Sequence, residues 1–154
     1  MTVALEWNPA PDEVRPLFLE YAGSLSFGLE FQGFEGELAG LPGDYAPPGG
    51  ALLLARVSGT PAGCVALRRI EAGTAELKRL YVRPGHRGLG LGRLLAEAVV
   101  EHARELEYQR LRLDTAPEMA AAHELYTGLG FHEIAAYREN PVGGARFLEL
   151  DLTG

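Results

Sequence analysis

The sequence predicts a single domain of the α/β class, built around a mixed β sheet. Its 154 residues (1–154) match one ordinary domain, and a chain of this size can bury about 68–70% of its unfolded surface. Hydrophobic residues make up 47% of the chain and charged residues 23%, as is typical of a globular protein. Strand-like and helix-like patterns follow in the order β-α-α-β-β-β-α-β-α-β-β, and this mixture indicates the fold class.

The N-terminal third is predicted to hold one strand and two helices. Residues 2–7 have the composition of a short strand, which ends at the prolines that follow. Four apolar residues then recur on one helical face: Val14, Leu17, Phe18 and Tyr21. Pro16 is expected in the first turn of that helix, where its missing N–H costs little. A second short helix is expected around residues 32–39, before a loop rich in proline and glycine.

After Gly50 the pattern changes to strands separated by turns. Three strands are expected in succession, at residues 51–57, 62–70 and 75–82. The remaining elements are a helix from Leu89 to Leu106, a strand at 110–114, a helix at 117–129, and closing strands at 131–137 and 146–152.

The charge of the chain is negative overall but positive in one stretch. Twenty-one acidic residues against fourteen basic ones give a net charge of −7, which argues against general nucleic-acid binding. Between Lys78 and Arg93 there are five cations and His86 but no acid. This composition suits a site for a small anion, although a solvated basic face has the same composition.

The glycine-rich turn after residues 75–82 carries the most chemical information. Glycine stands at positions 88, 90 and 92, so the backbone can approach a ligand closely and present free N–H groups at the start of a helix. Arg87 and Arg93 add positive charge there, which suits a phosphate or pyrophosphate. The dinucleotide motif G-x-G-x-x-G fails, because Arg93 stands where the last glycine is needed, and no lysine completes a P-loop.

Three segments together resemble the GNAT superfamily of N-acyltransferases. Arg87, Gly90 and Gly92 fill the pattern Arg/Gln-x-x-Gly-x-Gly/Ala, after the strand Glu-Leu-Lys-Arg-Leu-Tyr-Val-Arg-Pro that begins at Glu76. The later segment 122–131 fits Ala-x-x-Leu-Tyr-x-x-x-Gly-Phe. The resemblance covers residues 50–137, and the N-terminal part is similar to one bacterial branch. It implies a mostly antiparallel sheet with helices on both faces and a splayed central strand pair.

The resemblance also implies acetyl-coenzyme A (acetyl-CoA) as co-substrate, with no metal, and a small-molecule or peptide amine as acceptor. The backbone of one continuous segment would hold the pyrophosphate of coenzyme A: Arg87, Gly88, Leu89, Gly90, Leu91, Gly92 and Arg93. The pantetheine arm would pair with the strand backbone at Leu80, Tyr81 and Val82, in the gap beside residues 111–115. An N–H near Leu80 would stabilise the negative charge on the thioester oxygen.

Proton transfers are assigned on the same basis. Tyr126 lies where many family members place the acid that protonates the departing thiolate. Glu76 is the candidate base, with Glu35 and Glu37 as competitors. One departure from the family pattern is Met119, at a position where the family often has asparagine, so a polar contact to coenzyme A is expected to be missing or replaced.

Several alternatives stay open from the sequence alone. The chain is an enzyme in the first hypothesis and a non-catalytic sensor of acyl-CoA in the second, while a nucleotide-binding domain of another type is disfavoured by the failed motifs. Cys64 cannot form an internal disulfide, so a cytoplasmic setting is expected, with no signal peptide and no membrane span. Its thiol and the aromatic rings of Phe27, Phe31 and Phe34 are expected in the core. A homodimer is compatible with the resemblance, and the acceptor is left open.

Overall fold

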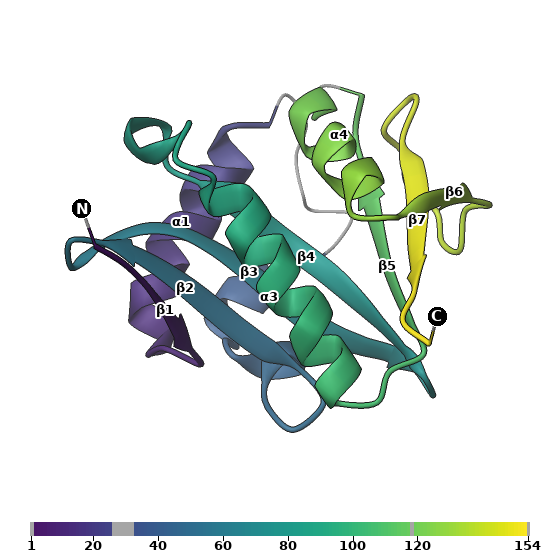
Figure 1. Ribbon diagram of the computed structural model, residues 1–154, viewed down its shortest axis with the longest axis horizontal. Coiled ribbons are helices and arrows are strands. Elements are labelled where there is room, and N and C mark those ends of the chain that lie inside the picture. The colour runs from purple at the N-terminus through teal and green to yellow at the C-terminus, as the bar shows by residue number, and fades with distance from the viewer. Residues whose placement is uncertain (1, 26–32, 118, 154) are drawn as a thin grey trace.

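The computed structural model describes residues 2–25, 33–117 and 119–153 (Figure 1). One sheet contains seven strands in the order β1-β2-β3-β4-β5-β7-β6. The strands are β1 (Val3–Trp7), β2 (Ala51–Val57), β3 (Thr60–Glu71), β4 (Thr74–Val82), β5 (Arg110–Thr115), β6 (His132–Ile134) and β7 (Arg146–Asp151). Every neighbouring pair is antiparallel except β4–β5, which is parallel. The expected mixed, mostly antiparallel sheet is confirmed.

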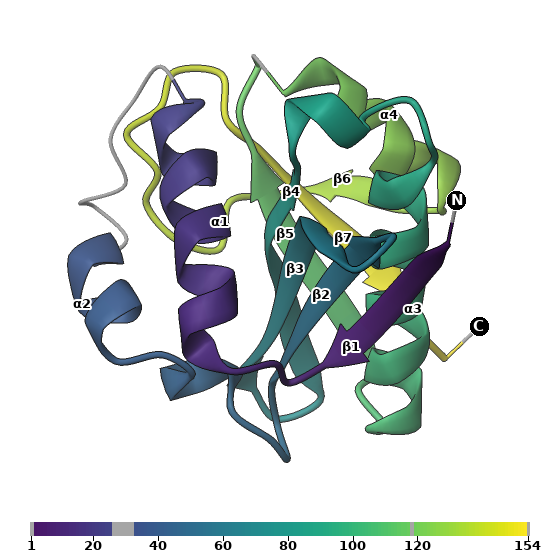
Figure 2. The ribbon, with the colours of Figure 1, turned by 90° about the vertical axis from the view of Figure 1, so that its left-hand side faces the viewer.

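Helices cover both faces of this sheet, as predicted. Figure 2 shows α1 (Pro11–Gly23) and α2 (Phe34–Ala39) on one face, with α3 (Leu91–Glu105) and α4 (Ala120–Gly128) on the other. Two 3-10 turns, η2 (Gly43–Tyr45) and η3 (Pro84–His86), complete the elements that matter for the site.

Two hydrophobic layers fill the space between the helices and the sheet. Strand β2 serves both, because successive side chains point to opposite faces: Leu53 packs in the layer under α3, and Leu52 and Leu54 pack in the layer under α1. This explains why residues 51–57 form a continuous apolar run rather than an alternating one. Each fully buried leucine stabilises the fold by roughly 1.5–3 kcal/mol.

The central strands β4 and β5 separate after a short shared segment. They pair only from Thr74↔Arg110 to Glu76↔Arg112, whereas β5 and β7 pair over six residues. Figure 1 shows the two strands diverging beyond this point. A bulge accompanies the separation: the register between β3 and β4 shifts, and Arg79 has a φ of 61°. An extra residue bends and twists the strand that carries it, so the bulge directs β4 away from β5. The expected splayed pair is confirmed.

Several predicted boundaries and one predicted role were wrong. Pro16 is not in the first turn of α1, because the helix begins at Pro11 and Pro16 lies inside it. Pro11 takes the position in which a missing N–H is harmless. The helix survives Pro16 because Val14, Leu17 and Phe18 are fully buried, and tertiary packing outweighs the lost hydrogen bond.

The last helix and the strand after it are shorter than predicted. Helix α4 begins at Ala120 rather than 117, and β6 spans three residues rather than 131–137. Phe34 and Cys64 are buried in the layer under α1, as expected. Phe27 and Phe31 lie outside the described residues. Among the helices in the described part of the chain, none combines the length and the apolar character that a membrane span needs.

Candidate active site

The glycine-rich turn joins β4 to α3 through η3. Gly88 and Gly90 have φ values of 84° and 77°, which side-chain-bearing residues rarely adopt. An ideal Cβ at either position would meet no described atom within 4 Å. The backbone conformation, and not packing within the protein, therefore requires glycine at both positions. The turn is open to a ligand on this side.

The N-terminus of α3 supplies hydrogen-bond donors to that open side. The N–H of Leu94 bonds to the carbonyl oxygen of Gly90 at 3.1 Å, so the N–H groups of the three residues before Leu94 precede the first helical bond. Within the described residues, no side chain caps this terminus. Free amides and the positive end of the helix dipole together suit an anionic group such as a pyrophosphate.

The basic run between Lys78 and Arg93 divides among three places. Arg87 donates to the carbonyl oxygen of Val82 at 3.0 Å, and Arg93 pairs with Glu97, so both remain at the surface beside the turn. Arg83, by contrast, is held by Glu20 of α1. Lys78 and Arg79 are buried, being only 8% and 3% exposed. The basic composition therefore concealed three different environments: the surface beside the turn, the ion pair with α1, and the buried part of β4.

Beyond Glu76, the edge of β4 that faces β5 forms no pairs with β5 in the described part of the chain. Leu80, Tyr81 and Val82, the predicted contacts of the pantetheine arm, all lie in this segment. On the other edge, β3 pairs with Tyr81 and Val82, which fixes the segment in place. The backbone near Leu80 is thus presented at the opening between β4 and β5, directly after the bulge at Arg79.

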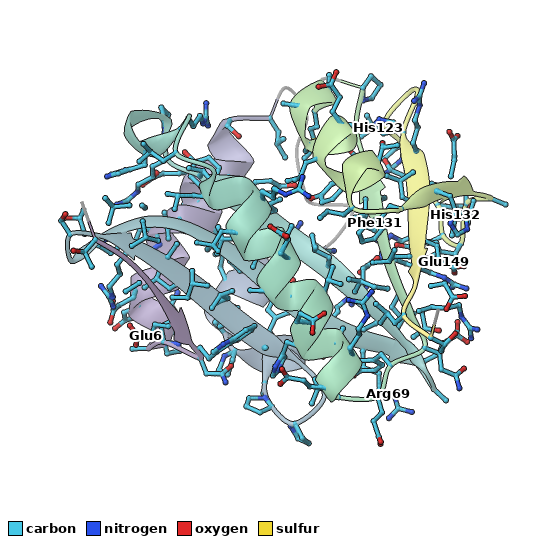
Figure 3. The ribbon with its side chains drawn as sticks, viewed as in Figure 1. Glu6, Arg69, His123, Phe131, His132 and Glu149 are labelled. Atoms are coloured by element: carbon cyan, nitrogen blue, oxygen red, sulfur yellow. The ribbon has the colours of Figure 1, made fainter. Side chains whose placement is uncertain are left out.

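Tyr126 lies in the layer under α3 and α4 and is 4% exposed. Its ring packs edge-on against Phe131, with centroids 5.6 Å apart. Figure 3 shows Phe131 where the chain leaves α4. Burial raises the pKa of the Tyr126 phenol, and so do Tyr21 and Asp114. A raised pKa keeps the phenol protonated and able to donate.

Glu76 is fully buried and its two carboxylate oxygens are already engaged. Oε1 accepts from Nε of Arg68 at 2.9 Å, while Oε2 accepts from the hydroxyl of Tyr137 at 2.6 Å and lies 2.5 Å from Nη2 of Arg138. Burial alone would raise the pKa of Glu76, but the charges of Lys78 and Arg138 and the Tyr137 hydrogen bond outweigh it and lower that pKa. These contacts suit a fixed structural anion better than a group that must accept a proton.

The two competitors for the base differ in their placement. Glu37 accepts two hydrogen bonds from Arg79, at 2.8 and 2.9 Å, and its side chain keeps 15% exposure. Glu35 is exposed in the first turn of α2. Only Glu37 of these two lines the pocket beside β4.

This pocket has a volume of about 490 Å³ and lies on the face of the sheet that α1 and α2 cover. Its walls come from α2, η2, β3, β4 and the segment after β6. The lining residues are Gly33, Gly36, Glu37, Gly40, Pro42, Gly43, Asp44, Tyr45, Arg68, Lys78, Arg138 and Glu139. It therefore opens beside the part of β4 that has left β5.

Sequence reasoning missed most of the charged residues of this pocket. Arg68 and Arg138 lie 70 positions apart and belong to no local motif. Asp114, which pairs with Arg138 at 3.1 Å, was placed only as part of a strand. Lys78 carried one signal, since it is the only lysine in the chain. Among the residues that the structure describes, no group of three or more His, Cys, Asp and Glu side chains is arranged to hold a metal ion.

The chain is similar to two kinds of curated relative. An uncharacterized N-acetyltransferase of Schizosaccharomyces pombe is 37% identical over 144 residues, which cover 92% of this chain and 88% of that protein. The N-acetylaspartate synthetase of Rattus norvegicus is 37% identical over 91 residues, which cover 58% of this chain and 30% of that protein.

Solved structures share the fold over nearly the whole chain. An acetyltransferase of the GNAT family from Staphylococcus aureus has a TM-score of 0.81 at 21% identity, covering 98% of this chain and 99% of that one. The protein yncA of Salmonella typhimurium, solved with its cofactor acetyl-CoA, has a TM-score of 0.71 at 19% identity and covers 99% and 95%. The model of the acetyltransferase (GNAT) family matches residues 10–131. The chain therefore belongs to the GNAT family of acetyltransferases and is an acyltransferase.

Proposed function

We propose that the protein transfers the acetyl group of acetyl-CoA to a primary amine by direct attack, without a covalent acyl-enzyme. The observation that carries the proposal is the early end of the β4–β5 pairing at Glu76, after which the backbone of Leu80, Tyr81 and Val82 is not paired with β5. The glycine-rich turn follows this segment, Tyr126 packs in the layer under α3 and α4, and the pocket lies on the α2 side. The relative from Rattus norvegicus is named for an N-acetylated product, which agrees with an amine acceptor.

Each group of residues has a separate task in this proposal. The amides of residues 87–93 bind the pyrophosphate, and the unpaired edge of β4 orients the pantetheine arm at Leu80, Tyr81 and Val82. Acetyl-CoA supplies an activated thioester. The N–H near Leu80 donates to the thioester oxygen, where negative charge develops, and this preorganised donor lowers the barrier.

Proton transfer completes the exchange of bonds. The amine nitrogen forms a bond to the acyl carbon while the carbon–sulfur bond breaks, and Tyr126 donates a proton to the departing sulfur. The amine must lose a proton before or during attack. Glu76 is fully buried and is not among the residues that line the pocket, whereas Glu37 lines it and its side chain keeps 15% exposure, so we assign proton removal to Glu37, directly or through a water. Glu37 lines the pocket and contacts Arg79, the residue before Leu80.

The alternative function, a sensor that binds acyl-CoA without turnover, needs only the turn and the opening. It gives no role to Tyr126 or to a pocket on the opposite face of the sheet. The N-acetyltransferase relatives favour the enzyme.

The test compares the wild type with Tyr126→Phe, which keeps the ring that packs against Phe131. Both proteins are incubated with acetyl-CoA and a panel of amines, and acetylated products are measured by mass spectrometry. We expect equal acetyl-CoA affinity and a fall in kcat of about 100-fold in the variant, at the lower end of general-acid effects. Binding of acetyl-CoA without product from any amine would favour the sensor, and an unchanged kcat in Tyr126→Phe would remove the acid role.

A further inference from the structure

Three cationic side chains from separate parts of the chain converge on the pocket beside β4. Arg68 comes from β3, Lys78 from β4, and Arg138 from the segment after β6. The side chains of Arg68 and Arg138 are 28% and 25% exposed, so both remain accessible from the pocket. Three positive charges around one small cavity must be balanced, either by acidic side chains of the protein (internal neutralisation) or by an anionic ligand.

Internal neutralisation uses only part of the donors that the two arginines offer. Arg68 bonds to Glu76 through Nε alone, and its Nη1 stays 3.7 Å from Asp44, beyond hydrogen-bond distance. Arg138 directs Nη2 at both Glu76 and Asp114, while its Nε is buried without a partner among the described residues. A guanidinium has five N–H donors in a planar fork, so each arginine retains donors suited to a carboxylate.

Glu76 holds Arg68 and Arg138 in place. Its Oε1 binds Arg68 and its Oε2 binds Arg138, so a single buried carboxylate orients two guanidinium groups toward one cavity. The hydroxyl of Tyr137 fixes the second oxygen at 2.6 Å. Within this arrangement Glu76 acts as a positioning residue, because its oxygens are directed at the arginines and it is 0% exposed.

Lys78 lies near three guanidinium groups and one buried carboxylate. Its pKa is lowered to about 8, first by burial and then by the charges of Arg79, Arg138 and Arg68, whereas the charge of Glu76 raises it. An anion bound beside Lys78 would relieve this repulsion. Three acids also line the pocket: Glu37 is paired with Arg79, the side chain of Asp44 is 81% exposed, and Glu139 follows Arg138 in the sequence.

We propose that the acceptor is an amine that also carries a carboxylate, such as a free amino acid, and that Arg68, Lys78 and Arg138 bind this carboxylate. Lys78 lies two residues before Leu80 on β4, on either side of the bulge at Arg79. The carboxylate and the attacking amine would therefore be held by neighbouring residues of one strand. This inference rests on the proposed acetyl transfer and deepens it by naming the class of acceptor.

The experiment compares free amino acids with their carboxamides, which differ chiefly in the negative charge. Initial rates with glycine and glycinamide, alanine and alaninamide, and a short diamine give kcat/KM for each acceptor in the presence of saturating acetyl-CoA. The amine of an amide loses its proton more readily than that of the free acid, so a site indifferent to charge would favour the amide. We expect the wild type to prefer the free acid at least tenfold.

Variants locate that preference in the pocket. Lys78→Met and Arg138→Met should reduce the preference to below threefold, mainly through KM, with acetyl-CoA affinity unchanged. Lys78→Arg, which keeps the charge, should restore it. Amides or diamines acetylated as well as the free acids by the wild type would overturn the carboxylate assignment and leave acetyl transfer intact. Absence of any acetylated amine would instead overturn the proposed function, so the two failures are distinguishable even where a variant does not fold.

Discussion

The two sides of the opening between β4 and β5 are built from different parts of the chain. The side toward α3 uses backbone amides from one continuous segment, residues 87–93. The side toward α2 uses charged side chains from β3, β4, α2 and the segment after β6. A site made of consecutive amides leaves a motif in the sequence, whereas a site made of side chains far apart in sequence exists only after folding. We call the side toward α3 the backbone half and the side toward α2 the side-chain half. Different substitutions should impair them, because one depends on backbone amides and the other on ion pairs.

The largest effect is expected at Glu76, in the side-chain half. Glu76→Gln removes the charge that holds Arg68 and Arg138, and breaking a buried ion pair costs about 3 kcal/mol of unfolding free energy. The KM for a carboxylate acceptor should rise at least tenfold, with a smaller change in kcat and with unchanged acetyl-CoA affinity. Denaturant unfolding and steady-state kinetics measure both.

The same variant separates the two roles considered for Glu76. If Glu76 were the base, kcat would collapse and the acidic limb of the pH–rate profile would disappear in Glu76→Gln. Under the present assignment those two changes occur in Glu37→Gln instead.

In the backbone half, Gly92→Ala should weaken acetyl-CoA binding without lowering the stability of the fold. A Cβ added there would meet Leu125 and Val82 at 3.8 and 4.0 Å, which are ordinary contacts, so Gly92→Ala should fold. Alanine in a helix should leave stability unchanged or raise it by up to about 1 kcal/mol. The added methyl group lies in the first turn of α3, where the ligand approaches the amides, so acetyl-CoA affinity should fall at least tenfold by calorimetric titration.

A matched control is available in another helix. Gly23 ends α1, and a Cβ there would meet nothing within 4 Å of the described structure. Gly23→Ala should leave acetyl-CoA affinity unchanged. Equal affinity losses in Gly23→Ala and Gly92→Ala, or none in Gly92→Ala, would contradict the placement of the pyrophosphate at α3.

The sequence could predict the backbone half because its requirements are local. The exact limits of β2 followed from an apolar run that is buried on both faces. The glycines at 88 and 90 follow from φ values that other residues rarely adopt. Pro16 was misplaced because Pro11 already takes the first position of α1, and the buried Val14, Leu17 and Phe18 keep Pro16 inside the helix.

The side-chain half could not be predicted from the sequence for a related reason. Arg138 follows the short strand β6 in an irregular segment, and nothing near it in sequence indicates a partner. Only the fold places it 2.5 Å from Glu76 of β4, 62 positions earlier. The sequence shows only that Glu76 is an acidic residue in a predicted strand. It does not show that Glu76 is buried, and it is the buried carboxylate that orients the two arginines.

A pH dependence follows from the charge of Lys78. Its pKa is lowered to about 8, so the ammonium is present below pH 8 and is lost as the pH rises through that value. For a carboxylate acceptor, the ratio of kcat/KM between wild type and Lys78→Arg should be flat below pH 8 and then fall up to tenfold per pH unit. A ratio that stays constant up to pH 9.5 would contradict the anchoring role.

Taking the ratio cancels the other titrations in the pocket. The charged groups around Lys78 occur in both proteins: Glu37, Asp44, Arg68, Glu76, Arg79, Arg138 and Glu139. The acceptor amine also titrates equally in both assays. What remains is the difference between a lysine that loses its proton and an arginine that keeps it.

The smallest effect is expected at Arg87. Its side chain is exposed, donates to the carbonyl oxygen of Val82 and lies 5.9 Å from the ring centroid of Tyr81. Exposed charges contribute up to about 1 kcal/mol, so Arg87→Ala should weaken acetyl-CoA binding only two- to fivefold. The loss should shrink as salt is added, because salt screens exposed charges. A loss larger than that of Gly92→Ala would mean that side-chain charge, and not the backbone, dominates this half.

Thermal unfolding with and without acetyl-CoA tests the central claim most directly. Acetyl-CoA at 100 times its dissociation constant should stabilise the wild type by about 2.7 kcal/mol, and the melting temperature should rise accordingly. Folded Gly92→Ala at the same ligand concentration should show a smaller rise. An unchanged melting temperature of the wild type at saturating acetyl-CoA would contradict the account, because the side toward α3 would then lack its assigned ligand and no acetyl donor would be bound.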